Sequence, residues 1–328
     1  MSKGTIILIL LAMGAALFTE LKGQDIHFSQ MDINPLIYNP AYAGFFNGTG
    51  RFGVVYRNQW ASVMSAYQTM AATAEYALLR RRYAHDGVSL GAFVYADNAG
   101  ALSYGSTVGT AVLSYFKSLN HNNSCFVSVG AEAGYGQSGY NPANAEVTDP
   151  NESFNTQQVT YPLLGLGAAV YYQPSEANLI RVGLSGRNLN RPNISYMGLD
   201  DVFLERRLNA YVRGEFRVLP SVAVMPMGAV QLQNQHREVI LGCDAKWYLS
   251  ETTFRQTAFA AGLQYRWADA LIACLSAEYN AFIFNFAYDA NISQLTPASG
   301  SIGAFEMGIV YRLVHRSVQL KAMPCPNF

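Results

Sequence analysis

Residues 208 to 218 read Leu208-Asn209-Ala210-Tyr211-Val212-Arg213-Gly214-Glu215-Phe216-Arg217-Val218, and this stretch decides the fold. The even positions are apolar or small, whereas the odd positions carry three charges, one amide and one tyrosine. Successive side chains of a β-strand point to opposite faces, so the stretch predicts a strand with one apolar and one charged face. The same alternation recurs along most of the chain, which predicts a transmembrane antiparallel β-barrel.

The composition supports a surface that faces lipid. Charged residues make up 13% of the 328 residues, about half the share of a soluble domain, while 21 Tyr and 18 Phe are present. A buried core alone would not require so few charges. The formal net charge is zero, which removes the electrostatic argument for binding nucleic acid.

The N-terminus has the layout of a cleavable signal peptide over residues 1–23. Lys3 supplies a positive charge, residues 5–18 are apolar, and Gly23 precedes Gln24. A retained N-terminal anchor is the alternative, although the apolar run is short for a spanning helix. Cys125 is the first cysteine, so a lipoprotein is not expected. We therefore expect export and an outer-membrane location.

The mature chain is expected to contain three parts. Residues 24–49 hold two prolines and form an irregular, plug-like lead-in inside or below the barrel. Residues 50–314 form the barrel, and residues 315–328 form a periplasmic tail. The predicted strands are 50–60, 66–79, 87–97, 102–118, 124–139, 160–173, 179–188, 207–219, 222–233, 238–249, 257–267, 271–280, 282–292 and 302–313.

The connections support a count of about fourteen strands. The three longest, near residues 140–159, 189–206 and 293–301, all follow odd-numbered strands. Links after even-numbered strands are shorter, such as Pro220-Ser221 and Asn280-Ala281. Long outside loops and short periplasmic turns are typical of outer-membrane barrels, so both ends of the barrel sequence should lie in the periplasm.

The charged faces must point into the lumen, because a charge in contact with lipid costs a few kcal/mol at the midplane. Their near balance of sign favours a lattice of ion pairs across the strands, and a selective pore is the alternative. The lattice is expected to include Arg57, Glu75, Glu132, Arg181, Arg187, Arg213, Glu215, Arg217, Asp244, Lys246, Arg266, Glu278, Asp289, Glu306 and Arg312.

No catalytic site, metal site or cofactor is expected, and the protein is not predicted to be an enzyme. The residues 134–139 match the pattern GxGxxG, but no helix pattern follows, so Gly130, Gly134 and Gly136 are better explained by close packing in the lumen. The five His are scattered and the four Cys form no CxxC pair. A disulfide between Cys125 and Cys325 is possible.

The lead-in and the last hairpin resemble the PorP/SprF family. The resemblance extends over the mature chain, and only Gly303-Ala304 departs from the usual pair of glycines. The motifs that carry it are Phe28-Ser29-Gln30, Asn34-Pro35-Leu36, Asn39-Pro40-Ala41-Tyr42-Ala43-Gly44, Tyr56-Arg57-Asn58-Gln59-Trp60, Tyr288-Asp289-Ala290-Asn291-Ile292-Ser293, Phe305-Glu306 and Cys325-Pro326-Asn327-Phe328.

The resemblance implies an outer-membrane component of the Bacteroidetes type IX secretion system. Such proteins support secretion or surface attachment of cargo with C-terminal sorting domains, including gliding adhesins, and work with a periplasmic ring. A diffusion channel for hydrophobic solutes and a purely structural barrel remain as alternatives. The motif residues expected to bind a partner are Asn34, Pro35, Tyr38, Asn39, Pro40, Tyr42 and Gly44.

Overall fold

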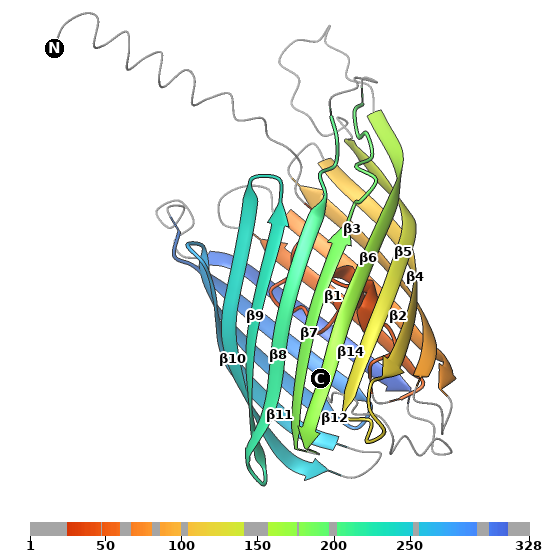
Figure 1. Cartoon of the computed structure of the whole chain (residues 1–328). Coiled ribbons are helices and arrows are strands. Elements are labelled where there is room, and N and C mark those ends of the chain that lie inside the picture. The colour runs from red at the N-terminus through yellow and green to blue at the C-terminus, as the bar shows by residue number, and fades with distance from the viewer. Residues whose placement is uncertain are drawn as a thin grey trace, which may run out of the picture.

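In the computed structural model, fourteen antiparallel strands form a closed barrel (Figure 1). The structure describes residues 25–46, 48–59, 67–80, 86–99, 104–140, 157–175, 177–196, 202–251, 256–293 and 302–313. The strands are β1 Gly50–Gln59, β2 Tyr67–Arg80, β3 Asp86–Ala99, β4 Tyr104–Ser118, β5 Cys125–Tyr140, β6 Gln157–Ser175, β7 Asn178–Arg187, β8 Arg207–Leu219, β9 Val222–Gln233, β10 His236–Glu251, β11 Gln256–Arg266, β12 Ala270–Tyr279, β13 Phe282–Asn291 and β14 Ile302–Leu313.

The predicted fold class and strand order are confirmed. β8, β9 and β14 have the predicted bounds, and the other strands differ from prediction by at most three residues at either end. β1 closes the barrel against β14, from Gly50 opposite Leu313 to Gln59 opposite Ala304. Trp60, which was expected to end the first strand, lies outside the described residues.

The alternation of side chains also follows the sequence pattern. On β8, Leu208 and Val212 point outward and are 52% and 45% exposed, whereas Tyr211 and Arg213 point inward and are buried. The opposite arrangement would place Arg213 in hydrocarbon, so the cost of a charge in lipid determines which face of the strand points outward. The outward surface is consequently apolar on every side of the barrel where strands are described.

The two ends of the barrel differ. Because the strand count is even, β1 begins and β14 ends at the same end, which we call the terminal end; the opposite end is the loop end. Trp247 of β10 lies toward the terminal end and the exposed Trp267 lies at the loop end, where its nitrogen donates to the carbonyl of Val239. Aromatic residues at both ends are typical of interfacial girdles.

β6 extends beyond its partner β7 at the loop end. β5 pairs with β6 as far as Gln157, but β7 pairs with β6 only from Leu166 onward in the direction of the terminal end. The segment after β7 continues along the open edge, where Asn190 donates to the carbonyl of Pro162 at 2.8 Å. Pro162 has no N–H to offer, and proline is tolerated in strands mainly at such edges.

Among the described residues, no helix is both long and apolar enough to cross a membrane.

Candidate functional site

The lumen holds residues 25–46, which we call the plug. The plug starts at the loop end, where the Asp25 carboxylate accepts a hydrogen bond from Asn188 at 2.7 Å. It runs through the barrel and approaches the terminal end, where the Phe45 ring packs edge-on against Phe116 at 5.0 Å. The plug therefore follows the lumen from one end toward the other before β1 begins.

Two short 3-10 helices shape the middle of the plug: η1 (Pro35–Ile37) and η2 (Pro40–Tyr42). Each begins with a proline, whose fixed φ suits the first position of a helix. The Asn39 side chain caps η2 and also donates hydrogen bonds to the carbonyls of Ala168 and Leu184, both at 3.1 Å. The two proline turns thus attach the plug to β6 and β7.

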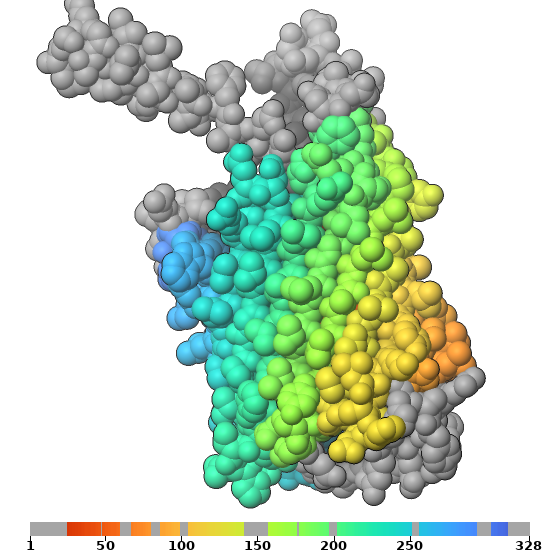
Figure 2. Space-filling model, in the orientation of Figure 1, coloured from red at the N-terminus to blue at the C-terminus, as the bar shows by residue number. Residues whose placement is uncertain are grey.

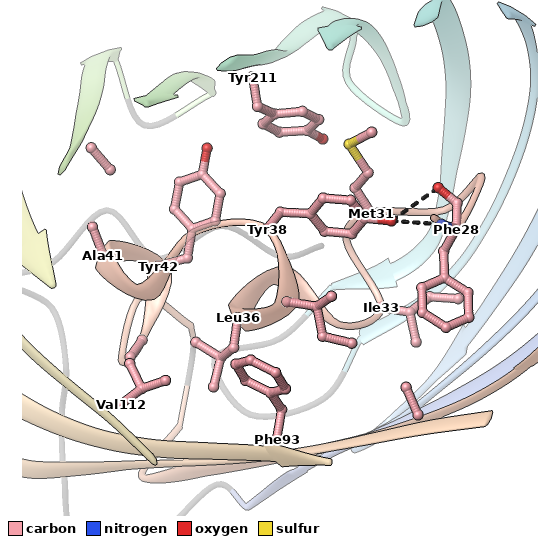
Figure 3. Close-up of a cluster of buried hydrophobic side chains, with 14 of the residues drawn as sticks. Phe28, Met31, Ile33, Leu36, Tyr38, Ala41, Tyr42, Phe93, Val112 and Tyr211 are labelled. Carbon is pink, nitrogen blue, oxygen red and sulfur yellow. Dashed lines mark hydrogen bonds between the residues drawn. The ribbon is translucent and has the colours of Figure 1, made fainter. Parts of the chain in front are cut away.

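Apolar side chains fill the space between the plug and the wall (Figure 3). Leu36 points from η1 toward Phe93 of β3, and both side chains are buried. Tyr38 folds back within the plug: its hydroxyl accepts a hydrogen bond from the Phe28 nitrogen at 2.7 Å and donates to the Phe28 carbonyl at 3.1 Å. The plug therefore contributes to the hydrophobic core of the barrel.

Ser29 lies at the centre of a buried cluster of charges, which we call the Ser29 cluster. Its hydroxyl donates to Asp289 at 2.9 Å and accepts from Arg57 at 2.9 Å and Arg266 at 2.6 Å. Its backbone nitrogen donates to Glu306 at 2.5 Å. Arg57 pairs with both Asp289 and Glu306, and Arg266 pairs with Asp289 at 2.9 Å. Two cations and two anions are thus joined through one serine.

Asp32 forms a second attachment. Its carboxylate pairs with Arg181 of β7, with Arg213 of β8 at 3.1 Å, and accepts from the Tyr211 hydroxyl at 3.0 Å. Burial alone would raise the pKa of Asp32, but the charges of Arg213 and Arg181 outweigh burial and lower the pKa to about 2. Asp32 is consequently ionised at neutral pH.

The remaining carboxylates of the predicted lattice also have polar partners in the lumen. Buried carboxylates without partners would carry a large desolvation cost, so this pairing is what permits so many charges inside the barrel. The pairs are Glu75 with Arg51, Glu132 with Arg187, Asp244 with Arg213, Glu278 with Lys246 and Arg312, and Glu215 with the Tyr248 hydroxyl, while Arg217 stacks on the Tyr248 ring.

Glycines in the wall make room for the plug. At each of six lumen-facing glycines, an added Cβ would lie closer than 3.0 Å to a plug atom, which is a steric clash. Gly130 was expected to permit close packing, and it faces the backbone of Pro40 and Ala41. Gly134 and Gly136 instead face side chains and backbone of neighbouring strands. The six are Gly53, Gly91, Gly130, Gly167, Gly183 and Gly308.

The structure places all of the motif residues that were expected to bind a partner inside the barrel. All of them are buried, and all except Pro35 have a contact with the wall of the same chain in the structure. The contacts of Ser29 and Asp32 are not among the predictions from the sequence, although both are polar residues in an apolar lead-in that enters a charged lumen. The buried residues in question are Asn34, Pro35, Tyr38, Asn39, Pro40, Tyr42 and Gly44.

Two cavities lie between the plug and the wall. One of about 280 Å³ opens near the loop end and is lined by His27, Arg207 and Glu238. The other, about 80 Å³, lies nearer the terminal end beside Asp32 and Asp244. The smaller cavity is large enough to hold water, and Asp32 and Asp244 supply polar partners for it. The larger cavity is lined by residues of β1 and β8 to β11, and the smaller one by residues of β1 and β8 to β14.

Within the described part of the chain, no group of three or more His, Cys, Asp or Glu side chains is arranged to hold a metal ion. Cys125 has no disulfide partner among the described residues, and Cys325 lies outside them.

Comparison with known proteins gives one family and a set of similar barrels. The family profile described as "Type IX secretion system membrane protein PorP/SprF" matches residues 20–311. The TodX monoaromatic hydrocarbon channel deltaS2 mutant is similar with TM-score 0.51 and 10% identity, covering 85% of this chain and 94% of that chain. The P. putida toluene transporter TodX is similar with TM-score 0.50 and 9% identity, covering 86% and 95%. No curated protein matches. At such identities the structural likeness shows the fold alone.

Proposed function

The chain belongs to the PorP/SprF family of type IX secretion system membrane proteins, and from this we propose that it supports secretion or surface attachment of cargo proteins that carry C-terminal sorting domains. Gliding adhesins are one class of such cargo. The protein is an outer-membrane barrel, so its part in secretion is performed within that membrane.

The observation that carries the proposal is the occupied lumen. Ser29, Arg57, Asp289 and Glu306 all belong to the motifs that characterise the two ends of the sequence, and they meet in the Ser29 cluster. These four motif residues therefore hold the plug inside the barrel. Because the plug occupies the lumen, a cargo protein would bind to the surfaces at the ends of the barrel and would not pass through a wide pore.

We assign the loop end to the cell exterior and the terminal end to the periplasm. The longer connections at the loop end support this orientation, because outer-membrane barrels carry their long loops outside. Cargo would then contact the segments 141–156 and 188–206, which follow β5 and β7. Other secretion components, including a periplasmic ring, would meet the terminal end.

Replacement of residues 190–205 by a Gly-Ser linker tests the proposal. Cargo display is expected to fall, while the barrel stays heat-modifiable and remains in the outer membrane. Replacement of the loop-end turn 234–235 by Asn-Gly is the matched control and should leave display unchanged. Deletion of residues 34–44 is expected to abolish display as well. Normal display after loss of both long segments and residues 34–44 would contradict the proposal.

A diffusion channel for hydrophobic solutes is the second candidate function. The two cavities favour it, since one opens near the loop end and the other lies nearer the terminal end, so both parts of the lumen contain unfilled space beside the plug. The plug residue Met31 borders the cavity nearer the terminal end. Solute uptake by liposomes that contain the purified protein would support this function, and the absence of both uptake and conductance would exclude it.

A further inference from the structure

The outward face formed by β6 to β9 contains a hollow of about 610 Å³ (Figure 2 looks onto this face). Lipid must cover this face in the membrane, so the shape and chemistry of the hollow decide which lipid fits best. Its floor is made of small residues and its walls of leucines: Ala168, Gly186 and Ala210, with Leu166, Leu184, Leu208 and Leu232.

The strand register explains why a hollow forms here. Gly186 of β7 pairs with Leu166 of β6 on one side and with Leu208 of β8 on the other. A glycine between two leucines leaves the volume of one large side chain open. At the next outward-facing position of β7, two residues further from the loop end, Ala168 and Ala210 flank Leu184 and extend the opening.

Two arginines border the hollow on its loop-end side. Arg237 of β10 pairs with Leu232, which lines the hollow. Arg206 directly precedes β8, two residues before Leu208, and its guanidinium donates to the carbonyl of Leu189 at 3.0 Å. Both side chains are exposed. Neither guanidinium has a carboxylate partner within the described residues, whereas the nearby Arg191 pairs with Glu205 at 2.7 Å.

The arginines lie at the height of lipid head groups. The backbone nitrogen of Trp267 donates to the backbone carbonyl of Val239, which is two residues from Arg237 on the same strand. Tryptophan is typical of the membrane–water interface, and both arginines lie where their strands begin at the loop end, Arg237 as the second residue of β10 and Arg206 directly before β8. A phosphate above the hollow would therefore be within reach of cationic side chains.

We propose that this face is a specific site for a phosphorylated, multiply acylated glycolipid of the outer leaflet, of the lipid A type. One acyl chain fills the hollow over Gly186, and Arg206 and Arg237 bind a sugar phosphate. Guanidinium groups suit phosphate because they offer paired donors in one plane. The inference rests on the orientation given under the proposed function, which sets the loop end outside.

Native mass spectrometry of the detergent-purified full chain, titrated with purified lipid A, tests the site. Wild-type protein should retain lipid A in preference to its dephosphorylated form. The double variant Arg206→Gln, Arg237→Gln should bind more weakly by about fivefold for each arginine removed. Lys117→Gln, which removes an exposed cation at the terminal end, should bind normally.

A second pair of variants tests the acyl site separately. Gly186→Leu should fill the hollow and therefore weaken binding of lipid A and of its dephosphorylated form alike. The barrel should tolerate the substitution, because an added Cβ meets only the flexible ends of Leu189 and Leu208. Gly228→Leu, at an outward glycine of β9 outside the hollow, should leave binding unchanged.

Three results would overturn the site: equal retention of lipid A and phosphatidylethanolamine, unchanged binding by the double arginine variant, or unchanged binding by Gly186→Leu. Inorganic phosphate at millimolar concentration should not displace lipid A; if it does, the arginines form a simple anion site and the lipid proposal fails. An epitope in the turn 234–235 tests the orientation in whole cells, so a failure there is distinguishable from a failure of lipid binding.

Discussion

The Ser29 hydroxyl donates a hydrogen bond to Asp289 at 2.9 Å, although the two residues are 260 positions apart in the chain. Ser29 belongs to the plug and Asp289 to the last hairpin of the barrel. Asp289 also accepts from Arg57 and Arg266, at 3.0 and 2.9 Å. One carboxylate therefore joins the plug to the last hairpin of the barrel.

Asp289→Asn should strongly destabilise the protein. The substitution leaves Arg57 and Arg266 buried with one fewer anion, and breaking a buried pair typically costs about 3–5 kcal/mol. The denaturant midpoint of the detergent-solubilised barrel measures the change. Asp269→Asn is the control: Asp269 also contacts Arg266, at 3.2 Å, but its side chain is 43% exposed, so a loss of less than about 1 kcal/mol is expected. Equal losses would contradict this account.

Asp32 should make stability depend on pH in acid. Its pKa is about 2 in the folded protein against 3.8 for the free group, so the unfolded chain binds the proton first as the pH falls. The stabilisation is fully present above about pH 5 and is lost as the pH falls toward 2; it amounts to about 2 kcal/mol. Unfolding measured from pH 6 to pH 2 should show a shallower acid dependence for Asp32→Asn than for wild type. Parallel curves would exclude this role.

Gly130→Val should displace the plug, because even a Cβ at this position clashes with the backbone of η2. Overpacking of this kind costs about 1–3 kcal/mol, and we expect a lower unfolding midpoint together with new ion conductance in planar bilayers. Gly109→Val on the neighbouring strand is the control, since no atom lies within 4 Å of its added Cβ. A stable, non-conducting Gly130→Val protein would show that the plug adapts.

Phe45→Ala should loosen the end of the plug. The Phe45 ring stacks on Tyr171 at 3.6 Å and packs edge-on against Phe116, so its removal should cost about 3–5 kcal/mol. Protease sensitivity of the plug and the unfolding midpoint both measure the effect. Phe52→Ala removes a ring that faces outward and is 48% exposed, and it should change neither quantity by as much.

The barrel could be predicted from the sequence because lipid enforces a strict alternation. Charges on β8 must face inward whatever the rest of the chain does, so Arg213 and Val212 alone indicate the two faces of that strand. The ends of the strands follow less closely from the sequence: β6 begins at Gln157, three residues before the predicted start. Nothing in the alternation itself limits how far a strand continues beyond the bilayer.

The contacts of the plug could not be predicted, because each is set by tertiary structure. These contacts depend on the path of an irregular segment inside the barrel. Examples are the hydrogen bond of Ser29 to Asp289 and the position of Asp32 between Arg181 and Arg213. Irregular segments have no periodicity from which a direction can be calculated. The small residues Gly130, Gly134 and Gly136 predicted close packing against that part of the wall, and of the three only Gly130 faces the plug.

The position of Asp289 and Glu306 on the last two strands has a consequence for assembly. The carboxylates that pair with Arg57 are Asp289 and Glu306, so its charge is neutralised only after β13 and β14 have been synthesised and folded. The same two strands also complete the cylinder, since β14 pairs with β1. A chain interrupted before β13 can therefore neither close the barrel nor form the Ser29 cluster, so one late folding event completes both the wall and this attachment of the plug.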